Sequence, residues 1–145
     1  RGAAAEIQRL VREAVITPQQ GGAADPARIA ALFSSPLGRE LLASDTLQRE
    51  FKFSILVPAR DYYPQAGEGE EVLLQGVVDC WFETLEGITV VDFKTDRITV
   101  EDLPARAESY RSQLTAYSRA LEEVTGRPVV RKVLWFFRLG RAVEL

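Results

Sequence analysis

The chain has 145 residues, of which 46% are hydrophobic, and this length and composition suit one compact domain with a buried core. A net charge of -3 excludes a protein that coats nucleic acid through overall charge and leaves room only for a localised basic groove. The single cysteine, Cys80, excludes a disulfide framework and a cysteine metal cluster, and favours a reducing, cytoplasmic setting. No apolar run approaches a membrane span, so we expect no membrane association.

The chain has no methionine and begins within a helical pattern, so we expect residues 1–145 to be a single domain cut from a longer protein. Residues 3–15 carry apolar side chains at helical spacing. Asp25-Pro26 and Ser35-Pro36 each join a capping residue to a proline suited to a first helical turn, and each predicts a short helix after it. We expect residues 1–46 to form a helical cover on one side of a sheet.

The hydrophobic period then changes to the alternation of strands. Residues 48–57 alternate apolar and polar side chains and predict a first strand with one apolar face. The segment 58–71 is rich in proline, glycine and acid, which predicts an exposed loop. Residues 72–83 and 88–94 are apolar at alternate and intervening positions alike, which predicts two more strands in a sheet covered on both faces.

The turn between the second and third strands decides which residues face each other. A two-residue loop at 85–86 pairs Asp79 with Asp92, whereas a loop at 86–87 places Asp79 opposite Lys94. Because strand side chains alternate with period two, either register places all three side chains on one face of the sheet.

The last third of the chain predicts one helix and one strand. The helix begins with Asp102 as a cap and Pro104 in its first turn, and Gly126 ends it. The run 129–139 has high strand propensity. The expected order is helix, three strands, helix, strand, an α/β arrangement whose core spans residues 47–139.

Asp79 and Asp92 supply the minimum oxygen ligands for Mg²⁺, which is typically held by one or two carboxylates, waters and a substrate phosphate. The backbone carbonyl of Phe93 is a plausible third ligand. Lys94 cannot bind a cation while charged, but beside a scissile phosphate it can offset developing negative charge. The chemistry that these residues indicate is phosphodiester hydrolysis.

Two further groups of residues have functional and structural readings. Gln113 and Tyr117 project from one helix face, with Tyr110 one turn earlier, and could support the site or contact DNA, but Tyr110 fits a core aromatic equally well. Glu50 fits either a third acid near the metal or an exposed strand charge. Core positions are expected for Cys80 and for four large aromatics, Trp81, Trp135, Phe136 and Phe137. Most arginines of the second half are expected on a solvated surface.

The three motifs GVVD at 76–79, VVDFKTDR at 90–97 and QLTAY at 113–117 resemble the RecB-like branch of the PD-(D/E)xK nucleases. Together with Arg49-Glu50-Phe51, they most resemble the C-terminal nuclease domains of AddA-type helicase-nucleases. The resemblance extends over roughly 37–139. It implies a restriction-endonuclease-like core, a mixed central sheet flanked by helices in the order α-β-β-β-α-β.

The resemblance also implies a Mg²⁺-dependent deoxyribonuclease, with Mn²⁺ as a possible substitute, that degrades unwound DNA strands during double-strand-break repair. The expected partners are DNA, an ATP-driven helicase portion of the same parent chain, and a second protein of the AddB type. By similarity, Asp79 and Asp92 are metal ligands and Lys94 is the catalytic lysine. The residues expected to bind DNA or support the site are Gln113, Tyr117, Tyr110, Thr95, Arg97 and Glu50.

One departure from the family pattern bears on activity. Members of this branch usually have a metal-contacting histidine on a helix upstream of these motifs, and this chain has no histidine. The alternative expectation is therefore an incomplete, nuclease-like module that binds DNA or a partner protein without cutting. A third reading is a small α/β domain in which the DFK triplet is an ordinary hairpin end.

Overall fold

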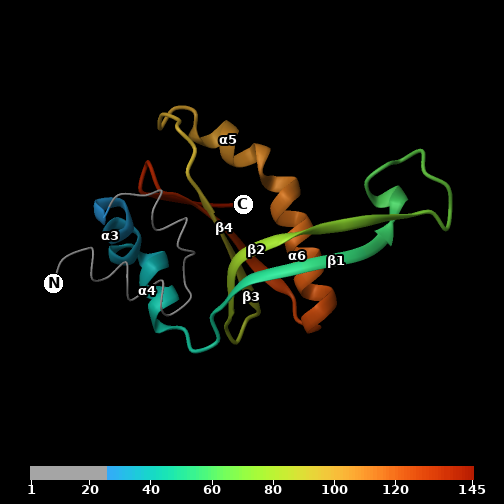
Figure 1. Cartoon of the computed structure of the whole chain (residues 1–145), viewed down its shortest axis with the longest axis horizontal. Coiled ribbons are helices and arrows are strands. Elements are labelled where there is room, and N and C mark those ends of the chain that lie inside the picture. Colours follow the sequence, from blue (N-terminus) through green and yellow to red (C-terminus); the bar gives the residue numbers. More distant parts are fainter. Residues whose placement is uncertain (1–25) are drawn as a thin grey trace.

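A mixed sheet with helices on both faces forms the framework of the chain in a computed structural model, which describes residues 26–145 (Figure 1). The five strands lie side by side in the order β1-β2-β3-β4-β5. Neighbouring strands are antiparallel except β3 and β4, which are parallel. The elements are α3 (Pro26–Ser34), α4 (Pro36–Ala43), β1 (Gln48–Pro58), the 3-10 helix η1 (Ala59–Asp61), β2 (Glu71–Glu83), β3 (Ile88–Lys94), α5 (Leu103–Ser109), α6 (Arg111–Thr125), β4 (Val129–Phe136) and β5 (Arg141–Glu144).

The three strands predicted at 48–57, 72–83 and 88–94 are confirmed as β1, β2 and β3. The start of α4 is also confirmed, since Ser35 is its cap and its side chain accepts a hydrogen bond from the Gly38 amide. The helix predicted at residues 3–15 and the capping role of Asp25 lie outside the described residues.

The predicted single strand at 129–139 is wrong at its end. The chain reverses after Phe136, where the amides of Leu139 and Gly140 donate to its carbonyl, and Gly140 adopts a positive φ of 62°. The chain then returns as β5 beside β4. One glycine within an apolar run is a weak turn signal, so the sequence did not indicate this fifth strand.

The predicted helix between 102 and 126 is in fact two helices. Tyr110 interrupts them with φ −95° and ψ −2°, so it ends α5 and precedes α6. Asp102 does not cap α5 through its side chain as predicted; its carboxylate accepts a hydrogen bond from Thr99 instead. Pro104 does lie in the first turn, and Gly126 ends α6 with a φ of 71°, as expected.

The sheet is covered on both faces, as its apolar strands predicted. Helices α3 and α4 pack on one face through a cluster that includes Cys80, Phe82, Phe93, Trp135 and Phe137. Helices α5 and α6 pack on the other face, against a second cluster. Its buried members are Phe53, Val78, Ile88, Val90, Leu103, Ala107, Leu114, Tyr117, Ala120, Leu121, Leu134 and Phe136.

The tryptophans and the two phenylalanines at the end of β4 pack inside the molecule. Trp135, Phe136 and Phe137 are buried, and Trp81 is partly buried against the α6 cluster. Cys80 is fully buried, and burial raises the pKa of its thiol. All five were expected in the core rather than as base-stacking platforms.

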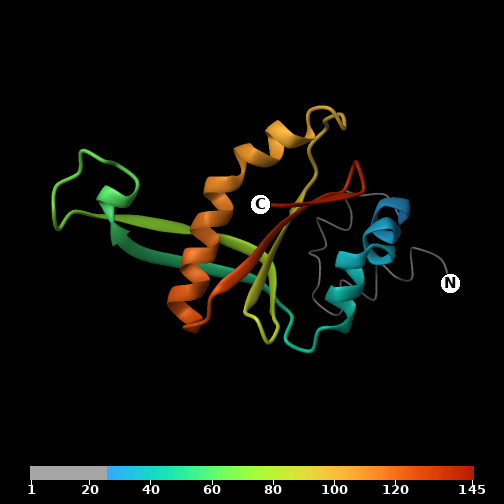
Figure 2. The same cartoon turned by 180° about the vertical axis from the view of Figure 1, so that it is seen from behind.

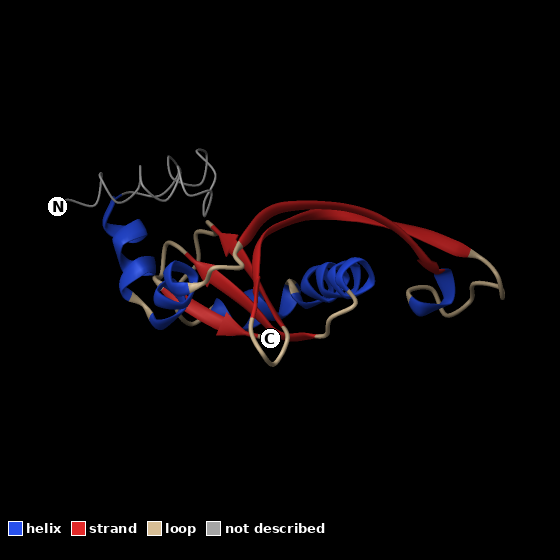
Figure 3. Ribbon diagram, turned by 90° about the horizontal axis from the view of Figure 1, so that it is seen from below, coloured by secondary structure: helices blue, strands red, loops and turns tan. Residues whose placement is uncertain are grey.

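Strands β1 and β2 continue beyond the sheet as a long two-stranded ribbon that curves over α6 (Figure 3). Figure 2, which shows the molecule from behind, shows the same ribbon crossing α6. The strand β2 packs against different helices on the two sides of Asp79. Cys80 packs in the α3 and α4 cluster, whereas Val78 packs in the α6 cluster. The site residue Asp79 therefore lies at the point where the ribbon bends.

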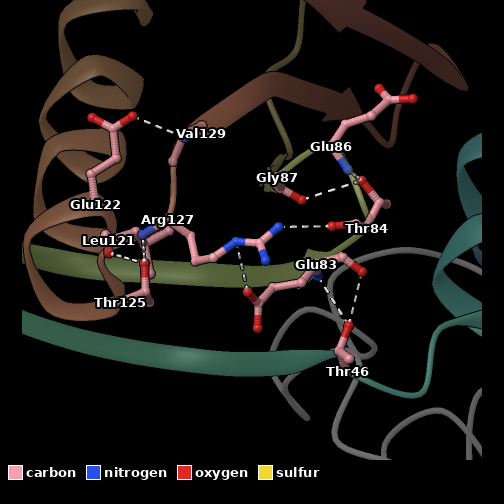
Figure 4. Close-up of polar contacts among 10 residues, drawn as sticks. All are labelled: Thr46, Glu83, Thr84, Glu86, Gly87, Leu121, Glu122, Thr125, Arg127 and Val129. Carbon is pink, nitrogen blue, oxygen red and sulfur yellow. Dashed lines mark hydrogen bonds and ion pairs between the residues drawn. The ribbon is translucent and has the colours of Figure 1, made fainter.

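A polar network holds the β2–β3 turn against the end of α6 (Figure 4). Arg127 donates to the carbonyl of Thr84 at 3.0 Å and lies 3.6 Å from the carboxylate of Glu83. Thr46 exchanges two hydrogen bonds with the backbone of Glu83, and the amide of Val129 donates to Glu122 at 2.9 Å. These contacts fix the ends of β2, β3 and β4 relative to one another.

Candidate active site

The turn between β2 and β3 closes over Leu85-Glu86. Thr84 and Gly87 exchange backbone hydrogen bonds of 2.8 and 3.2 Å, which makes the loop two residues long. The ladder pairs Cys80 with Val91, and in that register Asp79 comes opposite Asp92. Of the two registers that the sequence left open, the structure adopts the first.

The Asp79 carboxylate takes the place of a strand acceptor. The ladder between β2 and β3 ends at Cys80 and Val91. Beyond it, Oδ2 of Asp79 accepts a hydrogen bond of 2.8 Å from the backbone amide of Phe93. This bond satisfies a buried donor and orients the carboxylate toward the end of β3.

Asp92 lies within β3, only 3% exposed. The ammonium Nζ of Lys94 lies 2.6 Å from its Oδ2. The contact is an ion pair, and this buried oxygen forms no hydrogen bond among the described residues. The ammonium offsets part of the cost of burying the Asp92 charge, but one cation cannot balance both carboxylates of the site.

The surroundings of Asp79 favour its protonated form. Burial, followed by the hydrogen-bonding and charge interactions with Asp92, raises the pKa of Asp79 to about 8. The Phe93 amide and Lys94 oppose this rise. Two acids that cannot both ionise easily form a site that favours an added positive charge.

Helix α6 and the residue just before it contribute two neighbours of Lys94. Oε1 of Gln113 accepts a hydrogen bond of 2.7 Å from its ammonium, and the Tyr110 ring lies 3.9 Å from Nζ at its centroid. Tyr117 lies one helical turn beyond Gln113 and packs edge-on against Phe53 at 5.7 Å. Burial, with the nearby charges of Asp92 and Asp79, raises the pKa of Tyr117 to about 12.

Gly76 makes room for this arrangement. A Cβ atom at this position would lie 3.2 Å from both the Phe53 and the Tyr117 rings. The two rings are the nearest neighbours of the Gly76 backbone on this side. A side chain here would displace Tyr117, which lies beside the acids.

The structure also brings in Asp96 and Arg106, which the sequence did not single out as site residues. Asp96 accepts hydrogen bonds from the Tyr110 hydroxyl at 2.7 Å and from Arg106 at 2.5 Å. Burial alone would raise the pKa of Asp96, but these two donors hold it below its ordinary value. Continuing the alternation of Asp92 and Lys94 by two residues would have pointed to Asp96.

Three expected residues do not touch the acids. Glu50 comes opposite Asp79 in the β1–β2 register, but its backbone has a φ of 52° and its carboxylate pairs with Arg49 at 3.1 Å. Thr95 is exposed, and its carbonyl accepts from Arg138. Arg97 is exposed, and no hydrogen bond or ion pair joins it to another described residue.

Most arginines of the second half form ion pairs with nearby acids, which neutralises their charge locally. The pairs are Arg106 with Asp96, Arg111 with Glu108, Arg119 with Asp61, Arg127 with Glu83, and Arg131 with Glu40 and Glu144. The solvated-surface reading is therefore the better one for these side chains.

The residues present fit a small, hard cation. Two carboxylates suit Mg²⁺, which needs only one or two protein carboxylates when waters and phosphate complete its shell. Within residues 26–145, no group of three or more acids, histidines or cysteines could hold a metal. The side-chain contribution from this part of the chain thus amounts to a pair of acids.

The fold is that of a nuclease superfamily. A family model for the PD-(D/E)XK nuclease superfamily matches residues 2–144, and the chain belongs to this superfamily. It is similar to an ATP-dependent helicase/nuclease protein of Acetivibrio thermocellus, with 42% identity over 94% of this chain and 11% of the relative. The same-named protein of Carboxydothermus hydrogenoformans is 38% identical over 99% of this chain and 12% of its own length.

A third relative of that name, from Moorella thermoacetica, is 39% identical over 92% of this chain and 10% of its own length. All three relatives are of the AddA type, one of the subunits that make up such a helicase/nuclease. The chain spans about a tenth of the length of the curated relatives that it matches. Among residues 26–145, no helix is both long and apolar enough to cross a membrane.

Proposed function

We propose that this chain is the nuclease domain of a helicase-nuclease and that it hydrolyses phosphodiesters of unwound DNA strands, with Mg²⁺ as its cofactor, during double-strand-break repair. One observation carries the proposal: Asp79, Asp92 and Lys94 converge from two strands, and Asp92 is only 3% exposed with the Lys94 ammonium 2.6 Å from its Oδ2. One ammonium cannot balance two carboxylates at such a site, so the pair favours a further cation.

In this proposal, Asp79 and Asp92 bind the metal, with the Phe93 carbonyl as a third oxygen ligand. When bound, Mg²⁺ supplies Lewis-acid activation of the scissile phosphate and of the attacking water, and Mn²⁺ can replace it. Burial, together with the nearby Asp92, raises the pKa of Asp79, and this favours metal binding because a cation lowers the cost of ionising the acid.

Lys94 then stabilises negative charge that develops on the phosphate. Its ammonium is already held by Gln113 at 2.7 Å, so little rearrangement is needed as the charge grows. Tyr117 stays protonated through its raised pKa, and it can support the acids or donate to a DNA phosphate. The exposed Arg97 and the neighbouring Thr95 are suited to contact the DNA backbone.

The larger setting is suggested by the relatives, whose names describe one component of an ATP-dependent helicase/nuclease. We infer that a helicase portion of the same parent chain delivers the unwound strand, that a second protein of the AddB type completes the complex, and that the protein acts in the cytoplasm. Residues 47–139 would be its catalytic core, and residues 1–46 its helical cover.

A second candidate is a nuclease-like module that binds DNA or a partner without cutting. It is favoured by the lack of a third acid or histidine ligand within residues 26–145 and by the lack of any histidine in the chain. An upstream histidine from the parent protein would remove this objection.

Calorimetric titration of the chain with Mn²⁺ and Mg²⁺ tests the metal site. Binding by the wild-type chain and its loss in Asp92→Ala are expected. Equal binding by both would refute the ligand assignment.

Single-strand cleavage by the full-length protein tests the catalytic role. Lys94→Ala should abolish cleavage and leave ATP-driven unwinding intact. If wild-type protein binds metal and DNA yet cuts no strand, the non-cutting module is the better description.

A further inference from the structure

Tyr110 has a backbone position that two helices determine together. Its amide donates to the carbonyl of Ala107 at 3.0 Å, in the last turn of α5. Its carbonyl accepts from the Leu114 amide at 3.1 Å, in the first turn of α6. The break between the helices therefore fixes the backbone of Tyr110, from which the side chain projects, near the end of β3.

The ring of Tyr110 is held at its far end as well. One neighbour is the Phe136 ring, at a centroid distance of 6.4 Å and a tilt of 45°. The hydroxyl donates to Asp96 at 2.7 Å, and Asp96 is itself bound by Arg106 of α5 at 2.5 Å. The Asp96 side chain is only 9% exposed, so this bond is shielded from water.

Lys94 lies against this ring. Its ammonium is 3.9 Å from the ring centroid, a distance at which a cation is attracted to the aromatic face. The other two contacts of the ammonium are Asp92 at 2.6 Å and Gln113 at 2.7 Å. Its side chain is 13% exposed, so water competes weakly for these positions.

These three contacts differ in what would happen to them on metal binding. Under the proposed function, Asp92 turns its charge to the metal, and the ion pair with Lys94 weakens. The ring of Tyr110 and the amide of Gln113 would then be the remaining contacts that keep Lys94 near the acids. An aromatic face suits this task because it attracts the ammonium without taking up one of its three donors.

We propose that Asp96, fixed by Arg106, is a positioning residue that holds the Tyr110 ring against Lys94, so that the lysine keeps its place when Asp92 binds a metal. This inference rests on the proposed catalytic role of Lys94. Asp96 touches neither the acids nor the lysine and acts only through the ring. A merely structural Asp96 would affect the stability of the α5 region without changing the surroundings of Lys94.

Nuclear magnetic resonance can observe the lysine directly, because the chain has only three lysines, Lys52, Lys94 and Lys132. With ¹³C-labelled lysine, each ε-methylene signal is assigned by the corresponding substitution to arginine. The Lys94 signal of the wild-type chain should be displaced upfield by the ring current of Tyr110. Neither Lys52 nor Lys132 has an aromatic face within cation–π distance among the described residues, so their signals serve as references.

Tyr110→Leu should remove the upfield displacement completely, and Asp96→Ala should reduce it. Tyr110→Phe keeps the ring and fold but loses the bond to Asp96, so it should reduce the displacement by the same amount as Asp96→Ala. The double variant should show no further loss, as expected for residues that act as one unit. Glu108→Ala is the matched control, since Glu108 forms an exposed ion pair with Arg111 in the same region.

Cleavage by the full-length protein supplies the second measurement. Asp96→Ala and Tyr110→Phe should each lower kcat by roughly threefold and Tyr110→Leu by about tenfold, all with little change in KM, because a cation–π contact at a shielded site is modest. Glu108→Ala should leave kcat unchanged.

The inference is overturned if Asp96→Ala and Tyr110→Phe leave the Lys94 signal at its wild-type position. It is also overturned if the signal shifts but kcat stays unchanged while Lys94→Ala abolishes cleavage. If Lys94→Ala itself keeps full cleavage, the proposed function fails, and the resonance result still decides whether Asp96 holds the ring.

Discussion

Glu50 lies directly opposite Asp79 in the register of β1 and β2, and it is the only non-glycine residue with a positive φ among residues 26–145. The pairing keeps the same register on both sides of this position, so no residue is inserted. The bend of the ribbon is therefore produced by a left-handed backbone at Glu50, which is unfavourable for a residue with a side chain. Strain of this kind often accompanies a functional site.

Replacing Glu50 separates backbone strain from charge. Both Glu50→Gly and Glu50→Ala remove the carboxylate, but only glycine adopts a φ of 52° without penalty. The glycine variant should be more stable than the alanine variant by about 1 kcal/mol in denaturant unfolding.

Metal titration of the same two variants decides between the two readings of Glu50. We expect unchanged Mn²⁺ affinity, because Glu50 is exposed and its carboxylate pairs with Arg49. This result would show that Glu50 is an exposed charged residue of the strand without a role in metal binding. A large loss of affinity in both variants would instead show that Glu50 supports the metal.

The raised pKa of Asp79 predicts a pH dependence of stability in the absence of metal. The folded chain holds a proton on Asp79 up to about pH 8, whereas the unfolded chain releases it near the ordinary value of 3.8. The contribution of Asp79 is therefore fully present below about pH 4 and is lost as the pH rises toward 8.

Asp79→Asn removes this titration, because its amide stays neutral. Unfolding in EDTA should show the variant about 1 to 2 kcal/mol more stable than wild type at pH 8, with the difference shrinking as the pH falls. A difference that grows toward low pH would contradict the assigned environment of Asp79.

Gly76→Ala tests the packing that places Tyr117. The added methyl group would lie 3.2 Å from the rings of Phe53 and Tyr117, so both rings must move by a few tenths of an ångström. We expect a loss of about 1 to 2 kcal/mol in unfolding free energy, together with weaker single-strand cleavage.

Gly67→Ala is the matched control for that substitution. Its added Cβ would meet only the end of the flexible Glu70 side chain, at 3.3 Å. Stability and cleavage should therefore remain near wild type. Equal losses in the two variants would mean that ring contact at Gly76 is not the cause.

Gln113→Leu tests the hydrogen bond that orients Lys94. Leucine keeps the size of the side chain but offers no acceptor to the ammonium, which is left with the acid and the ring. Cleavage should fall by about tenfold, since a bond to a charged donor is worth roughly 1.5 kcal/mol or more. Gln75→Leu, at an exposed position of β2, should leave cleavage unchanged.

Much of this architecture was predictable from local patterns. The alternation of β1 and the continuous apolar runs of β2 and β3 located all three strands to within one residue, and β3 coincides with its predicted range. The proline and serine signals located the start of α4. The α5–α6 break, β5 and the turned backbone of Glu50 were missed, because each depends on packing with residues distant in sequence.

For the candidate site, the chain itself determined which residues could act. Two acids and a lysine at strand spacing, joined by a two-residue turn, must share a face, since period-two alternation and loop length are local properties. Only the tertiary structure decided which register the turn adopts and which helical residues reach Lys94. Those contacts require the crossing from β3 through α5 and α6 to β4, whose geometry is set by the buried cluster between helix and sheet. The bond from Tyr110 to Asp96, fourteen residues apart, exists for the same reason.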